Sequence, residues 1–224
     1  MRVTIRRKLL YSHFVAVLLV SGSVGTYFYR TAVTSLFEGL RTRLSYIAGL
    51  LSRTLDARDL DGLSGSGDTA LPAYVENLAL LREFQAANPD IAFLYVMRRD
   101  GERVEFVLDS DRSPEQALPG QEYPNPPAHL LRGFSEQAAD PEIVEDRWGV
   151  FLSGYAPLKH GEGRYLVGID MRADEVQRKL RSIRVAGGVS LAASVVLAYL
   201  FSLWMAARIT RPIGALVARA GEIA

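Results

Sequence analysis

Two neighbouring stretches decide the fold: DRWGVFLSGYAP, residues 146–157, and GRYLVGID, residues 163–170. Both are rich in aliphatic and aromatic residues, which is typical of β-strands. The short segment between them contains Gly161 and Gly163, and glycine at this position indicates a tight turn. We therefore expect a β-hairpin, with strands at about residues 148–158 and 164–170 and a turn at residues 160–163.

A second hairpin is predicted upstream of the first. Residues 91–97 are apolar at almost every position, as in a central strand, and Asp100-Gly101 is a tight-turn signal. In residues 103–109 apolar and polar positions alternate, so Asp109 is expected on the polar face, opposite Phe106. Hairpin-connected strands predict an antiparallel sheet.

Helices are expected on either side of these strands. Apolar residues recur every three or four positions over residues 33–51, and Pro72 is well placed to open a helix that ends near residue 87. A short helix is expected at residues 128–139, and a final helix from about Asp174. Residues 56–69 are rich in Asp, Gly and Ser and are interpreted as a loop. The predicted fold class is α+β, with helices covering an antiparallel sheet.

The distribution of charge indicates two membrane-spanning helices. The sequence has 26 Lys+Arg and 25 Asp+Glu, yet residues 9–29 and 185–207 contain none of these. Each of these runs reaches the roughly 20 residues that a helix needs to cross a bilayer core. Residues 1–8 carry four basic residues and no acidic one, and basic flanks stay in the cytoplasm. We expect both termini in the cytoplasm and residues 30–184 on the outside.

The outer segment is acidic in its central part, and we expect the first apolar run to be an uncleaved anchor rather than a signal peptide. Residues 57–171 contain 20 acidic and 10 basic residues, which is a weak bias against anionic ligands. The first apolar run exceeds the 7–15 residues typical of a signal peptide, and it ends without small residues for cleavage. The sequence has no Cys, so an outer domain must be stabilised without disulfides.

This order of features resembles the Cache family of extracytoplasmic sensor domains, whose fold is PAS-like. The likeness rests on Trp148-Gly149, the SGYAP strand at residues 153–157, the glycine turn and the closing VGID at residues 167–170. Residues 93–97 and 104–109 resemble the first hairpin of the same family, and the likeness covers roughly residues 32–170. It implies a PAS-like antiparallel sheet with a long N-terminal helix, and a small ligand bound between the sheet and its covering loop.

The candidate ligand-binding residues are polar or aromatic side chains on the predicted strands. Several lie beside glycines, which often mark a close approach of a ligand or of backbone. The candidates are Tyr95, Asp109, Trp148, Tyr155 and Asp170. Alternatives stay open: Tyr95 and Trp148 as core residues, Asp109 as a solvated residue, and Asp170 as a cap for the final helix. Relatives that bind amino acids use an acid near the closing strand for the ligand amine, and they also use an Arg-x-Trp-Tyr element. The second element is missing here, which argues against recognition of an amino acid.

The C-terminal segment is similar to the start of a HAMP linker. After ITRPI, residues 209–213, the apolar positions step by three, four and three residues, as in a coiled-coil seam. These positions are Ile213, Leu216, Ala220 and Ile223. Pro212 fits the first turn of a helix, where its missing N–H is not needed.

The predicted organisation therefore has five parts. They are a cytoplasmic N-terminus at residues 1–8, a first span at residues 9–29, a sensor domain with helical stalks at residues 30–184, a second span at residues 185–207 and an incomplete HAMP linker at residues 208–224.

These features predict a homodimeric receptor of the bacterial inner membrane. Its expected partners are a small molecule, the lipid bilayer and a second copy through the stalk and HAMP helices, and no nucleic acid. The expected output is a histidine kinase, with a diguanylate cyclase, phosphatase or chemoreceptor module, or a membrane binding or assembly subunit, as alternatives. The sequence contains no catalytic motif, and we expect no cofactor and no metal; Asp59, Asp61 and Asp68 are interpreted as a solvated acidic loop.

Overall fold

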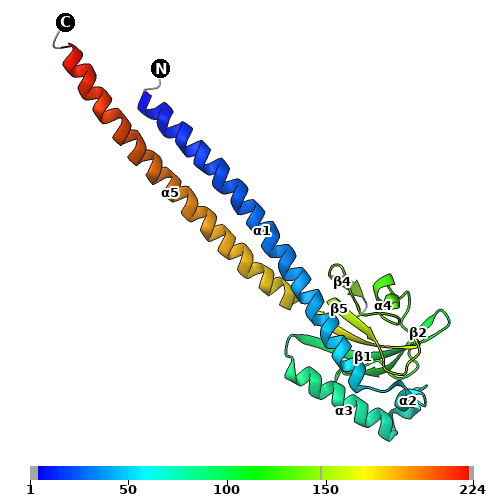
Figure 1. The fold of residues 1–224 in the computed structure, drawn as a ribbon. Helices are drawn as coiled ribbons and strands as arrows, with labels where there is room; N and C mark the ends of the chain where they lie inside the picture. The colour runs from blue at the N-terminus through cyan, green and yellow to red at the C-terminus, as the bar shows by residue number, and fades with distance from the viewer. Residues whose placement is uncertain (1–4, 147, 222–224) are drawn as a thin grey trace. The chain divides into compact units, whose positions relative to one another are not determined.

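The structure, a computed structural model, describes residues 5–146 and 148–221 (Figure 1). The elements in chain order are α1 (Ile5–Thr54), α2 (Ala57–Leu60), the 3₁₀ helix η1 (Ser66–Ala70), α3 (Pro72–Ala87), β1 (Ile91–Asp100), β2 (Arg103–Asp109), α4 (Ala128–Arg132), β3 (Ala138–Ala139), β4 (Val144–Asp146), β5 (Gly149–Pro157), β6 (Tyr165–Arg172) and α5 (Ala173–Gly221).

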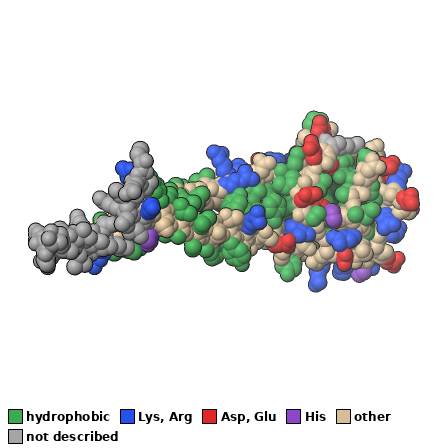
Figure 2. All heavy atoms as spheres, turned by 90° about the horizontal axis from the view of Figure 1, so that it is seen from above, with side chains coloured by type: hydrophobic (Ala, Val, Ile, Leu, Met, Phe, Trp, Pro, Cys, Tyr) green, Lys and Arg blue, Asp and Glu red, His purple; other side chains and the backbone are tan. Residues whose placement is uncertain are grey.

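The chain divides into two compact units. One unit is Leu36–Lys179, and the other is formed by α1 up to Ser35 and by α5 from Leu180. Both long helices are long and apolar enough to cross a membrane: an 18-residue window within Leu10–Thr54 has a mean hydropathy of 1.3, and one within Ala173–Met205 has a mean hydropathy of 1.9. Figure 2 shows hydrophobic side chains on the surface of the long helices.

The strands form one antiparallel sheet in the order β2-β1-β6-β5-β3, and β4 pairs with β5 beside β3. Both predicted hairpins, β1–β2 and β5–β6, are confirmed. In the first turn, Gly101 has a φ of +61°, a conformation that favours glycine. The predicted α+β fold, with an antiparallel sheet and a long N-terminal helix, is confirmed.

Helices cover one face of this sheet, which we call the helix face. Its β1 and β6 residues Leu94, Val96 and Ile169 are fully buried. α1 approaches β5 so closely that a Cβ added to Gly154 would lie 2.7 Å from the Cβ of Leu44. α3 packs against β1 and β2 within the same unit.

The predicted apolar stripe explains why α1 packs against the sheet. Within the sheet-bearing unit, the buried positions on α1 include Leu40, Leu44, Ala48 and Leu51, which are spaced by four, four and three residues. This spacing places them on one side of a helix. Tyr46, at 66% exposure, and Leu50, at 64%, lie on the opposite side.

Four expectations about the secondary structure are wrong. Residues 56–69 contain α2 and η1, because Asp56 accepts a hydrogen bond from the Arg58 N–H and Asp68 accepts from Ser64 and Gly65. The helix expected over residues 128–139 ends at Arg132, where Gly133 caps it, and β3 follows. Strand β4 was not predicted.

The fourth difference concerns the C-terminal segment. α5 continues to Gly221, so no helix begins at Pro212, because the apolar run that precedes it contains no stop signal. Pro212, Ile213, Leu216 and Ala220 are helical in their backbone, and Ile223 lies outside the described residues. The coiled-coil seam stays a prediction.

Candidate functional site

A β-bulge turns Asp109 toward the second face of the sheet, which we call the cavity face. In the β1–β2 ladder Tyr95 pairs with Asp109 and Met97 pairs with Phe106, so the pairing skips one residue of β2 between them. The extra residue reverses the alternation, and Asp109 shares a face with Phe106. Asp109 is only 6% exposed, which contradicts its interpretation as a solvated residue.

A small cavity lies between the cavity face and the chain that connects β2 to β5. Its walls come from β1, β2, β6 and that connection: Phe93, Tyr95, Met97, Phe106, Asp109, Asp111, Tyr123, Asp146, Trp148 and Asp170. The open volume is about 30 Å³, the size of one small chemical group. Four of the five residues predicted from the sequence line this cavity, and Tyr155 does not.

Aromatic rings form one wall of the cavity. Tyr123 and Trp148 stack with ring centroids 5.1 Å apart and planes at 8°. Phe106 meets Trp148 edge to face at 5.2 Å and Tyr95 at 5.9 Å. Because Trp148 contacts Phe106 and Phe106 contacts Tyr95, a displacement of the Trp148 ring would change the packing around Tyr95.

Asp146 fixes the position of this aromatic wall. Its carboxylate accepts hydrogen bonds from the backbone N–H groups of Trp148, at 2.8 Å, and Gly149, at 3.1 Å. The Tyr123 hydroxyl donates to the other carboxylate oxygen at 3.0 Å. One acidic side chain therefore holds both members of the stacked pair.

Asp170 is the buried acid of the cavity. It is 8% exposed, and the Tyr95 hydroxyl donates a hydrogen bond to its Oδ1 at 3.0 Å. Burial raises the pKa of Asp170 to about 8, against hydrogen bonds from Ser153 and Tyr95 that favour the ionised form. Asp170 lies within β6, where it pairs with Phe93 and Ser153, so its interpretation as a helix cap is wrong.

Asp109 holds the start of the covering segment against the sheet. Its carboxylate accepts hydrogen bonds from the backbone N–H groups of Asp111, at 3.0 Å, and Ala117, at 2.8 Å. Burial raises its pKa as well, while these two hydrogen bonds oppose the shift. Asp109 can therefore both line the cavity and position its cover.

Tyr155 lies on the cavity face of β5 but beside the cavity. Its hydroxyl donates to Asp140 Oδ1 at 3.2 Å, and its ring packs against Gly133. Burial raises the pKa of Asp140, which also accepts from the Ser153 N–H at 3.1 Å. These contacts join the segment before β4 to β5.

The sequence reasoning missed several residues of the cavity wall. Phe93 could have been found, because it shares the strand face of Tyr95 two residues away. Asp146 opens the stretch that decides the fold, and its role as an acceptor for the following N–H groups is a common one for Asp. Tyr123 lies in a proline-rich connection, where no periodic pattern indicates direction.

The described residues contain no group of three His, Cys, Asp or Glu side chains arranged to hold a metal ion.

The comparison with known families and with curated proteins gave no match. Matching solved structures include the ligand-binding domain of the Campylobacter jejuni chemoreceptor Tlp3 in complex with L-norvaline, with a TM-score of 0.41 and 12% identity over 80% of this chain. The same domain in complex with 4-methylisoleucine matches with a TM-score of 0.39 and 11% identity over 79% of this chain. In both comparisons the match covers 64% of the other chain, less than two thirds of its length.

Proposed function

We propose that this chain is the sensor part of a two-pass membrane receptor and that the cavity beside Asp170 binds its small-molecule ligand. One observation carries the proposal: a cavity with convergent acidic and aromatic side chains lies on the sheet face opposite the helices. Sites that bind small molecules are concave, mostly apolar and have a few convergent polar groups. A buried acid with a raised pKa at such a place is a further mark of a functional site.

The connection between the cavity and the second proposed span supports signalling rather than simple binding. β6 carries Asp170 and continues directly into α5 at Ala173, without a connecting loop. A displacement of β6 would therefore reach α5 through rigid backbone. A ligand can drive this change only if it binds one of two conformations more tightly than the other.

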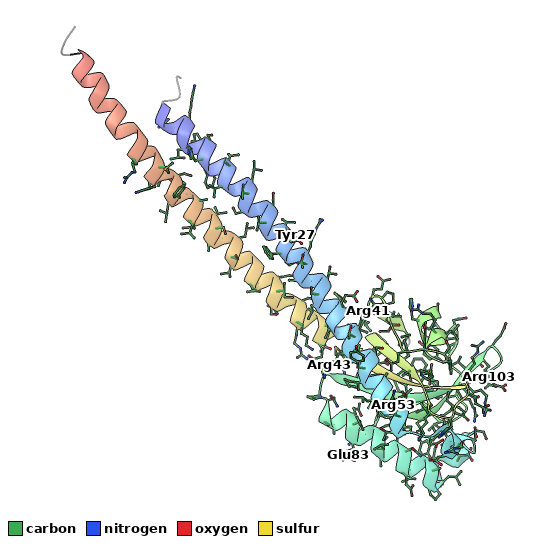
Figure 3. All side chains as sticks on the ribbon, viewed as in Figure 1. Tyr27, Arg41, Arg43, Arg53, Glu83 and Arg103 are labelled. Carbon is green, nitrogen blue, oxygen red and sulfur yellow. The ribbon has the colours of Figure 1, made fainter. Side chains whose placement is uncertain are left out.

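An ion-pair network joins the bases of the two long helices within the sheet-bearing unit. Arg43 on α1, labelled in Figure 3, forms a two-pronged contact with Asp90, just before β1. Lys179 on α5 lies 3.5 Å from the same carboxylate. Asp90 can thus transmit a movement of α5 to α1.

We propose that the receptor is a homodimer through the stalk part of α1. Tyr46 and Leu50 are one turn apart on α1, and both are about two-thirds exposed. A second copy would cover this apolar surface, and further contacts would follow in the HAMP-like segment beyond the second span.

The proposed topology places residues 1–8 and 208–224 in the cytoplasm and residues 30–184 outside, with spans at residues 9–29 and 185–207. The output module would follow residue 224, and a histidine kinase is our first candidate. A diguanylate cyclase, phosphatase or chemoreceptor module would receive the same movement of α5. A binding or assembly subunit would instead contact another membrane protein laterally.

A thermal-shift screen of the full chain in detergent tests the ligand site. The screen covers amines, amino acids, organic acids and metal ions at millimolar concentrations. We expect at least one compound to raise the unfolding temperature, and Trp148→Ala to remove that rise. Val150→Ala is the matched control, because Val150 is 40% exposed and does not line the cavity. A ligand whose effect survives Trp148→Ala would bind elsewhere and contradict the proposal.

A further inference from the structure

Three arginines beside the proposed spans have no acidic partner. They are Arg30 on α1 and Arg181 and Arg184 on α5, and all three are exposed. Residues 1–35 and 180–221 contain no Asp or Glu. Within the part of the chain that the structure describes, no group forms a hydrogen bond or an ion pair with these three guanidinium groups. A counter-ion for them has to come from outside these two segments.

The basic residues that come next along the two helices are paired. Each has an acid within ion-pair distance: Arg41 with Glu38, Arg43 and Lys179 with Asp90, and Arg178 with Glu175. On this part of α1 and α5, the lack of a partner is therefore confined to the arginines nearest the proposed spans.

A contact between the two helices brings Arg30 and Arg184 to a similar depth. A Cβ added to Gly187 would lie 3.6 Å from Cδ2 of Tyr29, so α1 and α5 approach each other here within one unit. Arg30 follows Tyr29 directly, and Arg184 precedes Gly187 by three residues, which is about 4.5 Å along a helix. The two arginines therefore differ in depth by about 3 Å along the helix axes.

This depth corresponds to the headgroup layer of a bilayer. That layer is about 5–7 Å thick on each side of the hydrocarbon core. Arg30 and Arg184 flank the two proposed spans directly, and Arg181 is one helical turn further out, about 4.5 Å. Tyr27, labelled in Figure 3, and Tyr29 add exposed aromatic rings at this end of the first span, as in the aromatic belts of membrane proteins.

The chemistry of the three arginines favours a lipid with a net negative charge. A guanidinium group binds phosphate through two parallel hydrogen bonds. A zwitterionic headgroup would also bring an ammonium group, which finds no acid in these segments and is repelled by the arginines. A lipid whose only charge is its phosphate avoids this repulsion.

We propose that Arg30, Arg181 and Arg184 bind an anionic phospholipid in the leaflet on the sensor side. The lipid phosphate would accept hydrogen bonds from Arg30 on α1 and from Arg184 on α5 together. A movement of α5 would change the spacing of these two groups, so the lipid would stabilise one of two conformations and regulate the receptor. This regulation rests on the proposed function, whereas lipid binding itself does not.

Fluorescence quenching by brominated lipids tests the proposal. Trp148→Phe and Trp204→Phe remove both native Trp residues from the full chain, and Phe28→Trp places one fluorophore at an exposed position beside the site. The protein is reconstituted in vesicles of phosphatidylcholine that contain increasing amounts of brominated phosphatidylglycerol. We expect phosphatidylglycerol to be favoured at position 28 by about fivefold or more, since one basic residue near an anionic surface contributes about fivefold.

Two pairs of substitutions separate charge from packing. Arg30→Gln with Arg184→Gln should bring the preference close to one, and Arg30→Lys with Arg184→Lys should keep it, because the charges remain. The matched control is Arg53→Gln with Arg112→Gln, which removes two exposed charges from the sheet-bearing unit and should behave like the parent protein.

Equal binding of the two lipids by the parent protein would overturn the inference. An unchanged preference in the Gln pair, or its loss in the Lys pair or in the control pair, would do the same. Inorganic phosphate, compared with chloride at equal ionic strength, should leave the preference unchanged, and loss of the preference in phosphate would assign the site to a free anion instead. The ligand cavity beside Asp170 is tested separately by the thermal-shift screen, so either proposal can fail while the other stands.

Discussion

At the scale of single residues, the buried carboxyl of Asp170 gives the folded domain a characteristic pH dependence. The pKa of Asp170 is raised from 3.8 to about 8 on folding, so the folded state binds a proton that the unfolded state has lost. Folding stability from this group is complete below about pH 4 and decreases as the pH rises to about 8, by up to about 1.4 kcal/mol per pH unit.

The first prediction follows from this loss of stability with rising pH. Asp170→Asn removes the titrating group, so the substituted protein should lose less stability than the parent between about pH 5 and about pH 8. Chemical unfolding of both proteins at the two pH values measures the difference. Parallel loss of stability in both proteins would mean that Asp170 titrates normally.

A second prediction concerns Gly168, which pairs with Tyr95 across β6 and β1. A Cβ at Gly168 would overlap the Tyr95 ring. Gly168→Ala should therefore push the ring aside, break its hydrogen bond to Asp170 and lower the free energy of unfolding by about 1–3 kcal/mol. Gly62→Ala is the control, since no atom lies within 4 Å of its added Cβ. Similar stability of the two substituted proteins would refute the close packing of this pair.

At the scale of secondary-structure elements, the sequence predicts the strands and helices better than it predicts their faces. Regular alternation in residues 103–109 places Asp109 opposite Phe106, but the bulge in β2 brings them together. A bulge depends on pairing with β1, so the local pattern of β2 alone does not reveal it. Strand β4 is only three residues long, which is too short for a periodic pattern to reveal it, although it pairs with the β5 residues that follow it directly.

The two sides of α1 lead to a third prediction. Leu44→Ala should lower the free energy of unfolding by about 2–5 kcal/mol, because Leu44 is fully buried against the sheet. Tyr46→Ala should change monomer stability by less than about 0.5 kcal/mol, since Tyr46 is exposed.

Single cysteines at positions 46 and 50 should crosslink between copies, and one at the exposed Val75 of α3 should not. Equal crosslinking at all three positions would contradict the proposed dimer.

At the scale of the whole molecule, the sequence predicts the membrane topology through its uncharged runs and basic N-terminal flank. The fourth prediction uses the lack of native Cys. A membrane-impermeant maleimide should label Arg103→Cys on intact cells, because this residue is exposed on the β1–β2 hairpin, which the proposed topology places outside. It should label Arg7→Cys only after the cells are opened. The reverse pattern would contradict the proposed orientation.

Four of the five candidate residues predicted from the sequence line the cavity, and Tyr155, which directly follows Gly154, does not. Tyr95, Asp109, Trp148 and Asp170 come from separate strands or strand ends, and the sheet brings them together. Tyr123 and the acid–aromatic contacts of Asp146 could not be predicted. They depend on the path of the connection between β2 and β5, which folds over the sheet without a repeating pattern.

The most direct test of the central claim is ¹⁹F NMR of the full chain with Trp204→Phe and 5-fluorotryptophan at position 148. The spectrum is recorded against the library of amines, amino acids and organic acids, because Trp148 lines the cavity and contacts its aromatic wall. If the cavity is the ligand site, at least one compound shifts the Trp148 resonance in a saturable manner, and Asp170→Asn weakens that shift. A resonance that no compound moves, or a shift that Asp170→Asn leaves unchanged, would contradict the account.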